Sequence, residues 1–169
     1  MAIRLEPFGE RHLAALEEIL DDPELLRFTR VPEPVPTGFS RTWLERYEEG
    51  RADGSREAFA IVDENDAFVG LALAPRIEDD ERTAELGYVV APAARGRGVA
   101  TEALRQLTEW AFSDQGMLRL ELLISVENTG SKRVAERCGY VREGVLRSLH
   151  VKEGVREDTE IWSRLASDD

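Results

Sequence analysis

A short stretch in the middle of the chain combines the residue types that bind anions. Residues 95–101 read RGRGVAT, with two arginines and two glycines in four consecutive positions. Glycine has no Cβ atom, so the backbone can turn sharply and a ligand can approach it closely. At the start of a helix, the first N–H groups and the positive end of the helix dipole face the same space. The stretch therefore predicts a site for a phosphate or a pyrophosphate.

Two common nucleotide-binding motifs do not fit this stretch. Thr101 stands where the dinucleotide-binding pattern G-x-G-x-x-G has its last glycine. The Gly-Lys-Ser/Thr sequence of a P-loop occurs nowhere in the 169 residues. These departures disfavour a nucleotide-binding regulatory module, and a glycine turn before a helix can also be purely structural.

Hydrophobic periodicity places the glycine turn between a strand and a helix. Residues 84–90 are typical of a strand, and the apolar positions of residues 99–111 recur at helical spacing. We predict an α+β fold, with about 6–7 strands in a largely antiparallel sheet and about four helices, and one parallel crossover around the turn. Further strands are expected near residues 3–5, 58–62, 68–73, 118–126, 140–152 and 155–165, and further helices near residues 13–20, after 23, around 43–47 and at 131–137.

Composition indicates one globular domain that spans residues 1–169. The formal net charge is -12, which argues against a nucleic-acid partner and mildly favours cationic substrates, although acidity also aids solubility. Cys138 is the only cysteine, so no internal disulfide and no cysteine zinc cluster can form, and we expect no metal. The chain has no run of 18 apolar residues and no signal-peptide core, so we expect a cytoplasmic protein with no membrane association.

The glycine turn resembles a known coenzyme-binding signature. Residues 95–100 resemble the Q/R-x-x-G-x-G/A pattern of the GNAT superfamily, whose ligand is acetyl-coenzyme A. Residues 85–92, 128–131 and 136–147 resemble the RimJ/RimL branch, whose founding members acetylate protein N-terminal amines. The resemblance implies strands that splay apart at a bulge around Val89 and Leu123 to hold the pantetheine arm. It also implies these coenzyme-binding residues: Val89, Val90, Arg95, Gly96, Arg97, Gly98, Val99, Ala100, Thr101 and Asn128.

The implied chemistry is attack of a neutral amine on the thioester carbonyl of acetyl-CoA. The reaction needs a stabilised oxyanion and a proton for the thiolate, and we expect a backbone N–H near Val90 to serve the oxyanion. Glu85 is the candidate base, or it only positions the amine; the alternative is an exposed strand carboxylate. Many GNAT enzymes have a tyrosine that acts as the general acid where this chain has Ala135. Ser131 is therefore the candidate acid, and a helix-start role is its alternative.

Three classes of function are compatible with these residues. The first is an N-acetyltransferase that uses acetyl-CoA, with a protein or peptide N-terminus as acceptor, or else a small amine such as a polyamine, an amino acid or an antibiotic. The second is a non-catalytic acyl-CoA-binding domain, which the missing tyrosine keeps open. The third is the nucleotide-binding module, which the absent motifs disfavour. The resemblance also implies a homodimer.

Overall fold

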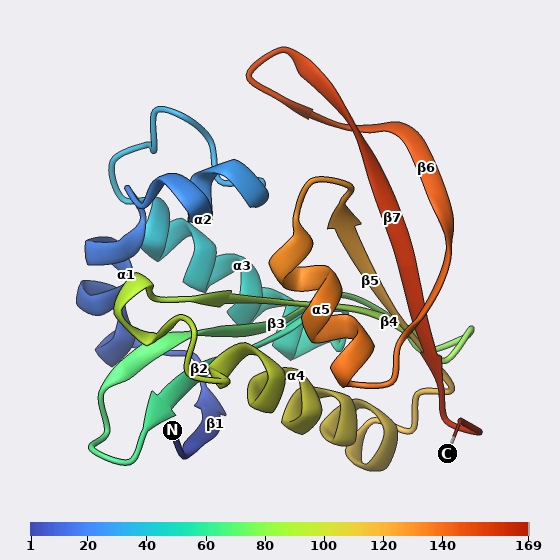
Figure 1. The fold of residues 1–169 in the computed structure, drawn as a ribbon. Coiled ribbons are helices and arrows are strands. Elements are labelled where there is room, and N and C mark those ends of the chain that lie inside the picture. Colours follow the sequence, from blue (N-terminus) through green and yellow to red (C-terminus); the bar gives the residue numbers. More distant parts are fainter. Residues whose placement is uncertain (169) are drawn as a thin grey trace.

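The chain folds around one seven-stranded sheet, and the computed structural model describes residues 1–168. The strand order across the sheet is β1-β2-β3-β4-β5-β7-β6 (Figure 1). Every neighbouring pair is antiparallel except β4 and β5, which run parallel. The strands are β1 (Ile3–Pro7), β2 (Glu57–Asp63), β3 (Phe68–Glu78), β4 (Thr83–Val90), β5 (Arg119–Ser125), β6 (Val141–Lys152) and β7 (Val155–Leu165).

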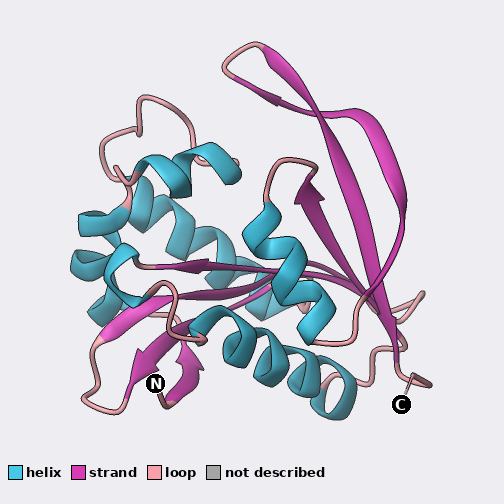
Figure 2. Ribbon diagram, in the orientation of Figure 1, coloured by secondary structure: helices cyan, strands magenta, loops and turns pink. Residues whose placement is uncertain are grey.

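Helices cover both faces of the sheet (Figure 1, Figure 2). Helices α1 to α3 enclose one hydrophobic core against the sheet, and α4 and α5 enclose the second core on the other face. The five α-helices of the described residues are α1 (Leu13–Ile19), α2 (Pro23–Phe28), α3 (Phe39–Asp53), α4 (Val99–Glu109) and α5 (Thr129–Arg137). Short 3-10 turns occupy Glu10–His12 and Pro92–Ala94, and a π-helical turn, Trp110–Asp114, continues α4.

The α+β fold predicted from the sequence is confirmed, with α2 as a separate fifth helix. Pro23 is its first residue, where a missing N–H costs no hydrogen bond. Asp22 caps it by accepting a hydrogen bond from the Leu25 N–H at 2.8 Å. Among residues 1–168, no helix has both the length and the apolar character that crossing a bilayer requires.

Strands β4 and β5 pair only at one end. Their register joins Thr83 to Arg119 and continues through the pair Glu85 and Glu121, and beyond this pair the two strands separate. The separation starts beside a register shift between β3 and β4, where two residues of β3, one of them Pro75, oppose Leu86. The predicted splay between these strands is therefore present, and the register shift lies four residues before Val90.

The hairpin of β6 and β7 extends past the end of β5. Strand β7 pairs with β5 as far as Thr159 opposite Ser125, and the hairpin continues beyond that pair. Near its end, the Lys152 ammonium donates to the carbonyl of Thr29 at 3.2 Å and to that of Val31. These hydrogen bonds connect the hairpin to the segment that follows α2.

Candidate active site

The glycine turn leads from β4 into α4. Gly96 has φ +72° and Gly98 has φ +81°, both in the left-handed region that favours glycine. Gly98 is the N-cap of α4, and a Cβ atom added there would meet no heavy atom within 4 Å. Open space therefore lies directly against the backbone where the first N–H groups of α4 have no intrahelical partners. This geometry fits an anion, as the sequence predicts.

Arg95 has a structural partner that the sequence did not reveal. Its guanidinium forms an ion pair with Asp22 and lies 3.6 Å from the Glu24 carboxylate. The hydrogen bond from Arg95 lowers the pKa of Asp22, the residue that caps α2. Arg95 therefore fastens the glycine turn to the start of α2, and part of its hydrogen-bonding capacity is already used within the protein.

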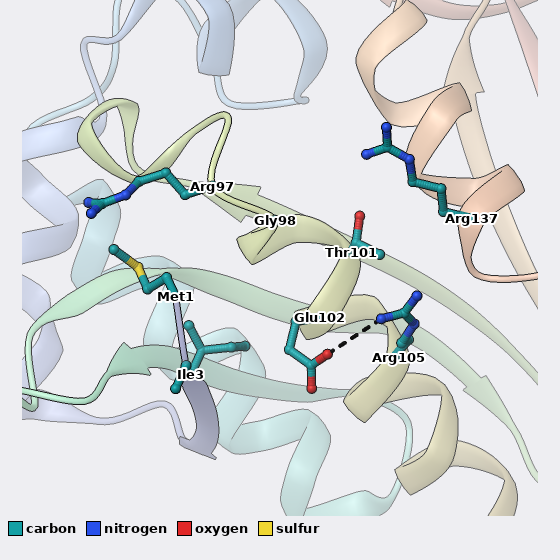
Figure 3. A pocket seen from close by; sticks show the side chains of 9 residues that line it. Met1, Ile3, Arg97, Gly98, Thr101, Glu102, Arg105 and Arg137 are labelled. Carbon is teal, nitrogen blue, oxygen red and sulfur yellow. Dashed lines mark ion pairs between the residues drawn. The ribbon is translucent and has the colours of Figure 1, made fainter.

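A basic pocket of about 610 Å³ adjoins the glycine turn (Figure 3). Arg97 and Arg137 lie on either side of Thr101 in this view, and neither has a carboxylate within 4.0 Å among residues 1–168. Arg105 is partly neutralised by Glu102, 3.7 Å away. Unpaired guanidinium groups bind phosphate well, so the pocket extends the anion site of the turn.

A cleft of about 910 Å³ occupies the split between β4 and β5. Strand β4 and helices α2, α3, α4 and α5 all contribute to its walls. The structure places all but one of the sequence-predicted site residues along this cleft, namely Glu85, Val89, Val90, Arg95, Gly96, Gly98, Val99, Ala100, Thr101, Asn128 and Ser131. The exception, Arg97, lines the adjoining basic pocket. Residues far apart in the sequence therefore share one surface.

The edge of β4 that faces the cleft offers unpaired backbone groups. The Ala91 N–H donates to the Val69 carbonyl at 2.8 Å, on the β3 side of the strand. Because N–H directions alternate along a strand, the N–H of Val90 points to the opposite side, where β5 has moved away. An extended amide-bearing ligand could pair with such an edge. The Val90 N–H is also placed to face an oxyanion in the split.

Asn128 begins α5 and places Ser131 at the cleft. The Asn128 side-chain oxygen accepts a hydrogen bond from the Ser131 N–H at 3.1 Å, which makes Asn128 the N-cap of the helix. The side-chain amide of Asn128 keeps its two N–H donors for other partners. Ser131 is therefore the third residue of the helix. Its hydroxyl does not cap the helix and can contact a ligand in the cleft.

Tyr88 is a residue that the sequence interpretation missed. Its hydroxyl is buried and has no hydrogen-bond partner within the described residues. Burial raises the pKa of Tyr88 to about 12, and the nearby Ser131 hydroxyl acts in the opposite direction, although the two hydroxyls are not in hydrogen-bonding geometry. A buried polar group without a partner is costly. A ligand atom in the split could satisfy it.

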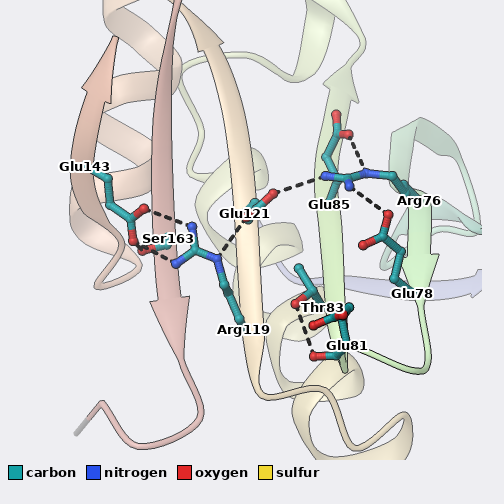
Figure 4. Close-up of polar contacts among 9 residues, drawn as sticks. All are labelled: Arg76, Glu78, Glu81, Thr83, Glu85, Arg119, Glu121, Glu143 and Ser163. Atoms are coloured by element: carbon teal, nitrogen blue, oxygen red, sulfur yellow. Dashed lines mark hydrogen bonds and ion pairs between the residues drawn. The ribbon is translucent and has the colours of Figure 1, made fainter. Parts of the chain in front are cut away.

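Glu85 lies at the last position where β4 pairs with β5, within a network of charges (Figure 4). Arg76 contacts Glu85 at 3.7 Å and Glu121 at 3.1 Å, so it separates two carboxylates that face each other across the strands. Burial raises the pKa of Glu85, and the positive charges of Arg30 and Arg76 lower it by a smaller amount. A carboxyl group with a raised pKa at a cleft is a better proton acceptor than an exposed one.

The charge network continues from Glu121 to the sheet edge. Arg119 lies 2.8 Å from Glu121 and also binds both oxygens of Glu143, at 2.8 and 2.9 Å (Figure 4). The hydrogen bond from Arg119 is the main reason that the pKa of Glu143 falls to about 2.

No group of three or more potential metal ligands lies close enough together in residues 1–168 to hold a metal ion.

Comparison with known proteins places this arrangement in a family. The sequence matches the Acetyltransferase (GNAT) domain family over residues 2–141. The probable N-acetyltransferase YjcK of Bacillus subtilis (strain 168) is 29% identical over 95% of this chain and 90% of its own length. Among solved structures, RimL, a ribosomal L7/L12 alpha-N-protein acetyltransferase in complex with coenzyme A, has a TM-score of 0.90 at 20% identity and covers 100% of this chain and 97% of its own.

A second solved structure has the same fold and acts on a different kind of amine. The spermidine N-acetyltransferase from Vibrio cholerae, in complex with CoA and spermine, has a TM-score of 0.86 at 22% identity, over 98% of this chain and 96% of its own. The family match and the N-acetyltransferase relatives define the class of the protein, an acyltransferase. The chain belongs to the GNAT acetyltransferase family.

Proposed function

We propose that the protein transfers the acetyl group of acetyl-CoA to a primary amine by direct attack, with both substrates bound together. The observation that carries the proposal is the continuous path from the glycine turn, along the open edge of β4, to Glu85. The pyrophosphate would lie against the turn, and the pantetheine arm would lie in the split. RimL and the Vibrio cholerae spermidine acetyltransferase were both solved with CoA, which supports the same ligand here.

The coenzyme contacts divide into three groups along this path. The pyrophosphate would meet the backbone of residues 95–101, with Gly98 giving the closest approach. The basic pocket beside the turn, with Arg97 and Arg137, would receive a further phosphate of the coenzyme. The pantetheine amides would pair with β4 near Val89 and with the amide nitrogen of Asn128.

The chemistry follows from the groups at the middle of the split. The amine nitrogen attacks the thioester carbonyl carbon, and the proton that it loses passes to Glu85, directly or through water. The Val90 N–H stabilises the oxyanion that forms. The carbon–sulfur bond then breaks, and the thiolate takes a proton from Ser131 or from the neighbouring Tyr88 hydroxyl. That hydroxyl regains its proton from water, and Glu85 releases the amine proton to water. A thiol has a pKa near 8.5, so only weak acid assistance is required.

The two solved structures with this fold act on different kinds of amine. RimL acts on a ribosomal protein, and the Vibrio cholerae enzyme acts on spermidine, so both a protein N-terminus and a small amine are compatible with this fold. The missing tyrosine at Ala135 keeps a non-catalytic acyl-CoA-binding domain as the second candidate. The raised pKa of Glu85 favours the enzyme over this alternative.

A two-stage experiment tests the proposal. Thermal unfolding with acetyl-CoA, ATP or NAD identifies the ligand, because a compound that binds only the native state raises the melting temperature. We expect a shift with acetyl-CoA alone. Release of the CoA thiol is then measured against a panel of amines and peptides. Acetyl-CoA binding without thiol release from any acceptor would favour the non-catalytic domain, and a shift with ATP or NAD alone would refute the coenzyme assignment.

We further propose that the chain acts as one domain, as a homodimer, in the cytoplasm. Both hydrophobic cores pack on the same sheet, which supports a single domain. The edge strand β6 and its turn into β7 carry a series of exposed apolar side chains, which supports a dimer: Val141, Val145, Leu146, Leu149, Val151 and Val155. Light scattering coupled to size exclusion would give the mass, and a monomer at micromolar concentration would refute the dimer.

A further inference from the structure

The end of the cleft remote from the glycine turn is basic, although the chain as a whole is acidic. Arg30, Arg46 and Arg56, which we call the arginine group, line this end from three separate parts of the chain. Arg30 follows α2, Arg46 lies on α3, and Arg56 precedes β2. Among residues 1–168, none of the three has a carboxylate within 4.0 Å. The three guanidinium groups therefore leave uncompensated positive charge at the cleft, which suits an anionic ligand.

The positive charges of the arginine group affect the titratable residues of the cleft, including the candidate base. Tyr47 lines the cleft, and burial raises the pKa of its hydroxyl to about 12. The positive charges of Arg56 and Arg46 lower this pKa, and the negative charge of Glu85 raises it. Arg30 is the largest charge effect on Glu85, and it favours the ionised carboxylate. The three guanidinium groups and Glu85 line the same cleft.

The existing contacts of the arginine group leave donors for a ligand. Arg56 donates one hydrogen bond, from Nε to the Pro75 carbonyl at 3.2 Å, which holds the side chain in place. Arg30 contacts the His150 Nε2 atom at 2.6 Å, and burial followed by the charge of Arg30 lowers the pKa of His150, so the imidazole is a neutral acceptor. Each guanidinium has five N–H donors, so most of them remain.

Arg76 provides a contrast within the same cleft. It contacts Glu78, Glu85 and Glu121, so its charge is compensated by the protein. The arginine group has no such compensation. Three aromatic side chains, Phe28, Phe39 and Trp43, also line the cleft. The acceptor end thus has one carboxylate for an amine, apolar walls for a carbon skeleton and three guanidinium groups for an anion.

We propose that the acceptor amine carries an anionic group, a carboxylate or a phosphate, which the arginine group binds while the amine lies at Glu85. This inference rests on the proposed acetyl transfer and names the class of its acceptor. A bidentate guanidinium contact both holds and orients such a group. A polyamine would place additional positive charges against the arginine group, where like charges repel. The acceptor is therefore an acidic amino acid or a peptide that begins with one, or a phosphorylated amine, rather than a polyamine.

The first part of the test compares acceptors that differ in whether the side chain carries an anionic group. The pairs are L-glutamate and L-glutamine, Asp-Ala amide and Asn-Ala amide, and O-phosphoserine and serine, with spermidine as the cationic reference. We expect kcat/KM to be about 10- to 100-fold higher for the anionic member of the preferred pair, which corresponds to the usual strength of hydrogen bonds to a charged group. The pair with the largest ratio separates a free amino acid, a peptide and a phosphate.

The second part removes the cations one at a time. Arg30→Gln, Arg46→Gln and Arg56→Gln each remove one positive charge, and Arg30 and Arg46 are exposed, so their replacement does not threaten the fold. We expect each to reduce the ratio between the anionic and the neutral acceptor at least fivefold. The matched control is Arg41→Gln, on the same helix as Arg46 but paired with Glu10 and outside the cleft. It removes the same charge and should leave the ratio unchanged.

A binding measurement separates failure of this inference from failure of the proposed function. The N-acetylated members of each pair are titrated calorimetrically into the protein with CoA present. Tighter binding of the products with an anionic side chain supports the arginine group whether or not turnover is seen, and absence of thiol release from every acceptor would refute the proposed function alone. Preference for spermidine or for the neutral members, or an unchanged ratio in all three glutamine variants, would overturn the inference.

Discussion

Gly98→Ala tests the glycine turn with a change of one methyl group. Gly98 has φ +81° and open space around the added Cβ atom, so the substitution creates no steric clash within the protein. The remaining cost is the left-handed backbone conformation, about 1 kcal/mol for a residue with a Cβ atom. For a chain of 169 residues this lowers the melting temperature by about 2–4 °C.

The same methyl group would occupy the space assigned to the pyrophosphate. Acetyl-CoA at 100 times its dissociation constant should stabilise the unsubstituted protein by about 2.7 kcal/mol, which is a shift of about 5–11 °C. Loss of close approach to the backbone should remove most of that shift in Gly98→Ala. Differential scanning fluorimetry with and without acetyl-CoA measures both effects in one experiment.

Gly54→Ala is the matched control for this experiment. Gly54 ends α3 with φ +80°, and an added Cβ atom there would meet only Asp79 Oδ2, at 3.9 Å. The two substitutions therefore carry the same backbone cost, but Gly54 lies outside the cleft. We expect Gly54→Ala to lose the same 2–4 °C without ligand and to keep the full acetyl-CoA shift. A full shift in Gly98→Ala would refute the anion site at the turn.

Four further predictions concern the middle of the split. Asn128→Asp keeps the oxygen that caps α5 but loses the amide donors, so its melting temperature should hold while the KM for acetyl-CoA rises; Asn128→Ala should also lose about 1 kcal/mol of stability. Glu85 has a pKa above its ordinary 4.5 and acts as a base in its ionised form, so kcat/KM should fall as the pH drops through that raised pKa. Glu85→Gln should abolish this acid limb of the pH profile and reduce kcat/KM about 10²- to 10⁴-fold. Tyr88→Phe removes a buried hydroxyl without a partner, so stability should stay equal or increase, and a fall of about tenfold in kcat at saturating acetyl-CoA would show a role in the reaction. A stability loss with unchanged kcat would contradict it, and Ser131→Ala, assayed beside it, should lower kcat by no more than about 10²-fold.

The elements of the fold could be predicted because each one has a local signal. The helix α4 buries Val99, Ala103, Leu104 and Leu107 at the spacing of one helical face. The prolines of residues 31–36 exclude a regular element, and the structure has a loop there. The glycine turn was visible for the same reason, since its residue types and its place before a helix are both local features.

The charged contacts of the site could not be predicted, because they join residues distant in the sequence. The pairing of Arg95 with Asp22 spans 73 positions and depends on how α2 packs beside β4. Nothing in a local pattern distinguishes Arg76, held by three carboxylates, from Arg46, which has none within 4.0 Å among residues 1–168. Tyr88 was missed for a related reason, because an apolar strand explains a tyrosine until the structure shows its hydroxyl without a partner.

The net charge of the chain favours a cationic acceptor, whereas the residues that line the cleft favour the anionic acceptor that we propose. Charges separated by more than about 8–10 Å are screened at physiological salt, so a substrate in the cleft senses the groups that line it rather than the total. Many acidic side chains face solvent or are paired with arginines elsewhere, as Glu143 is with Arg119. The arginine group has no such partners within the described residues. An acidic protein can thus present a positive site to an anionic substrate.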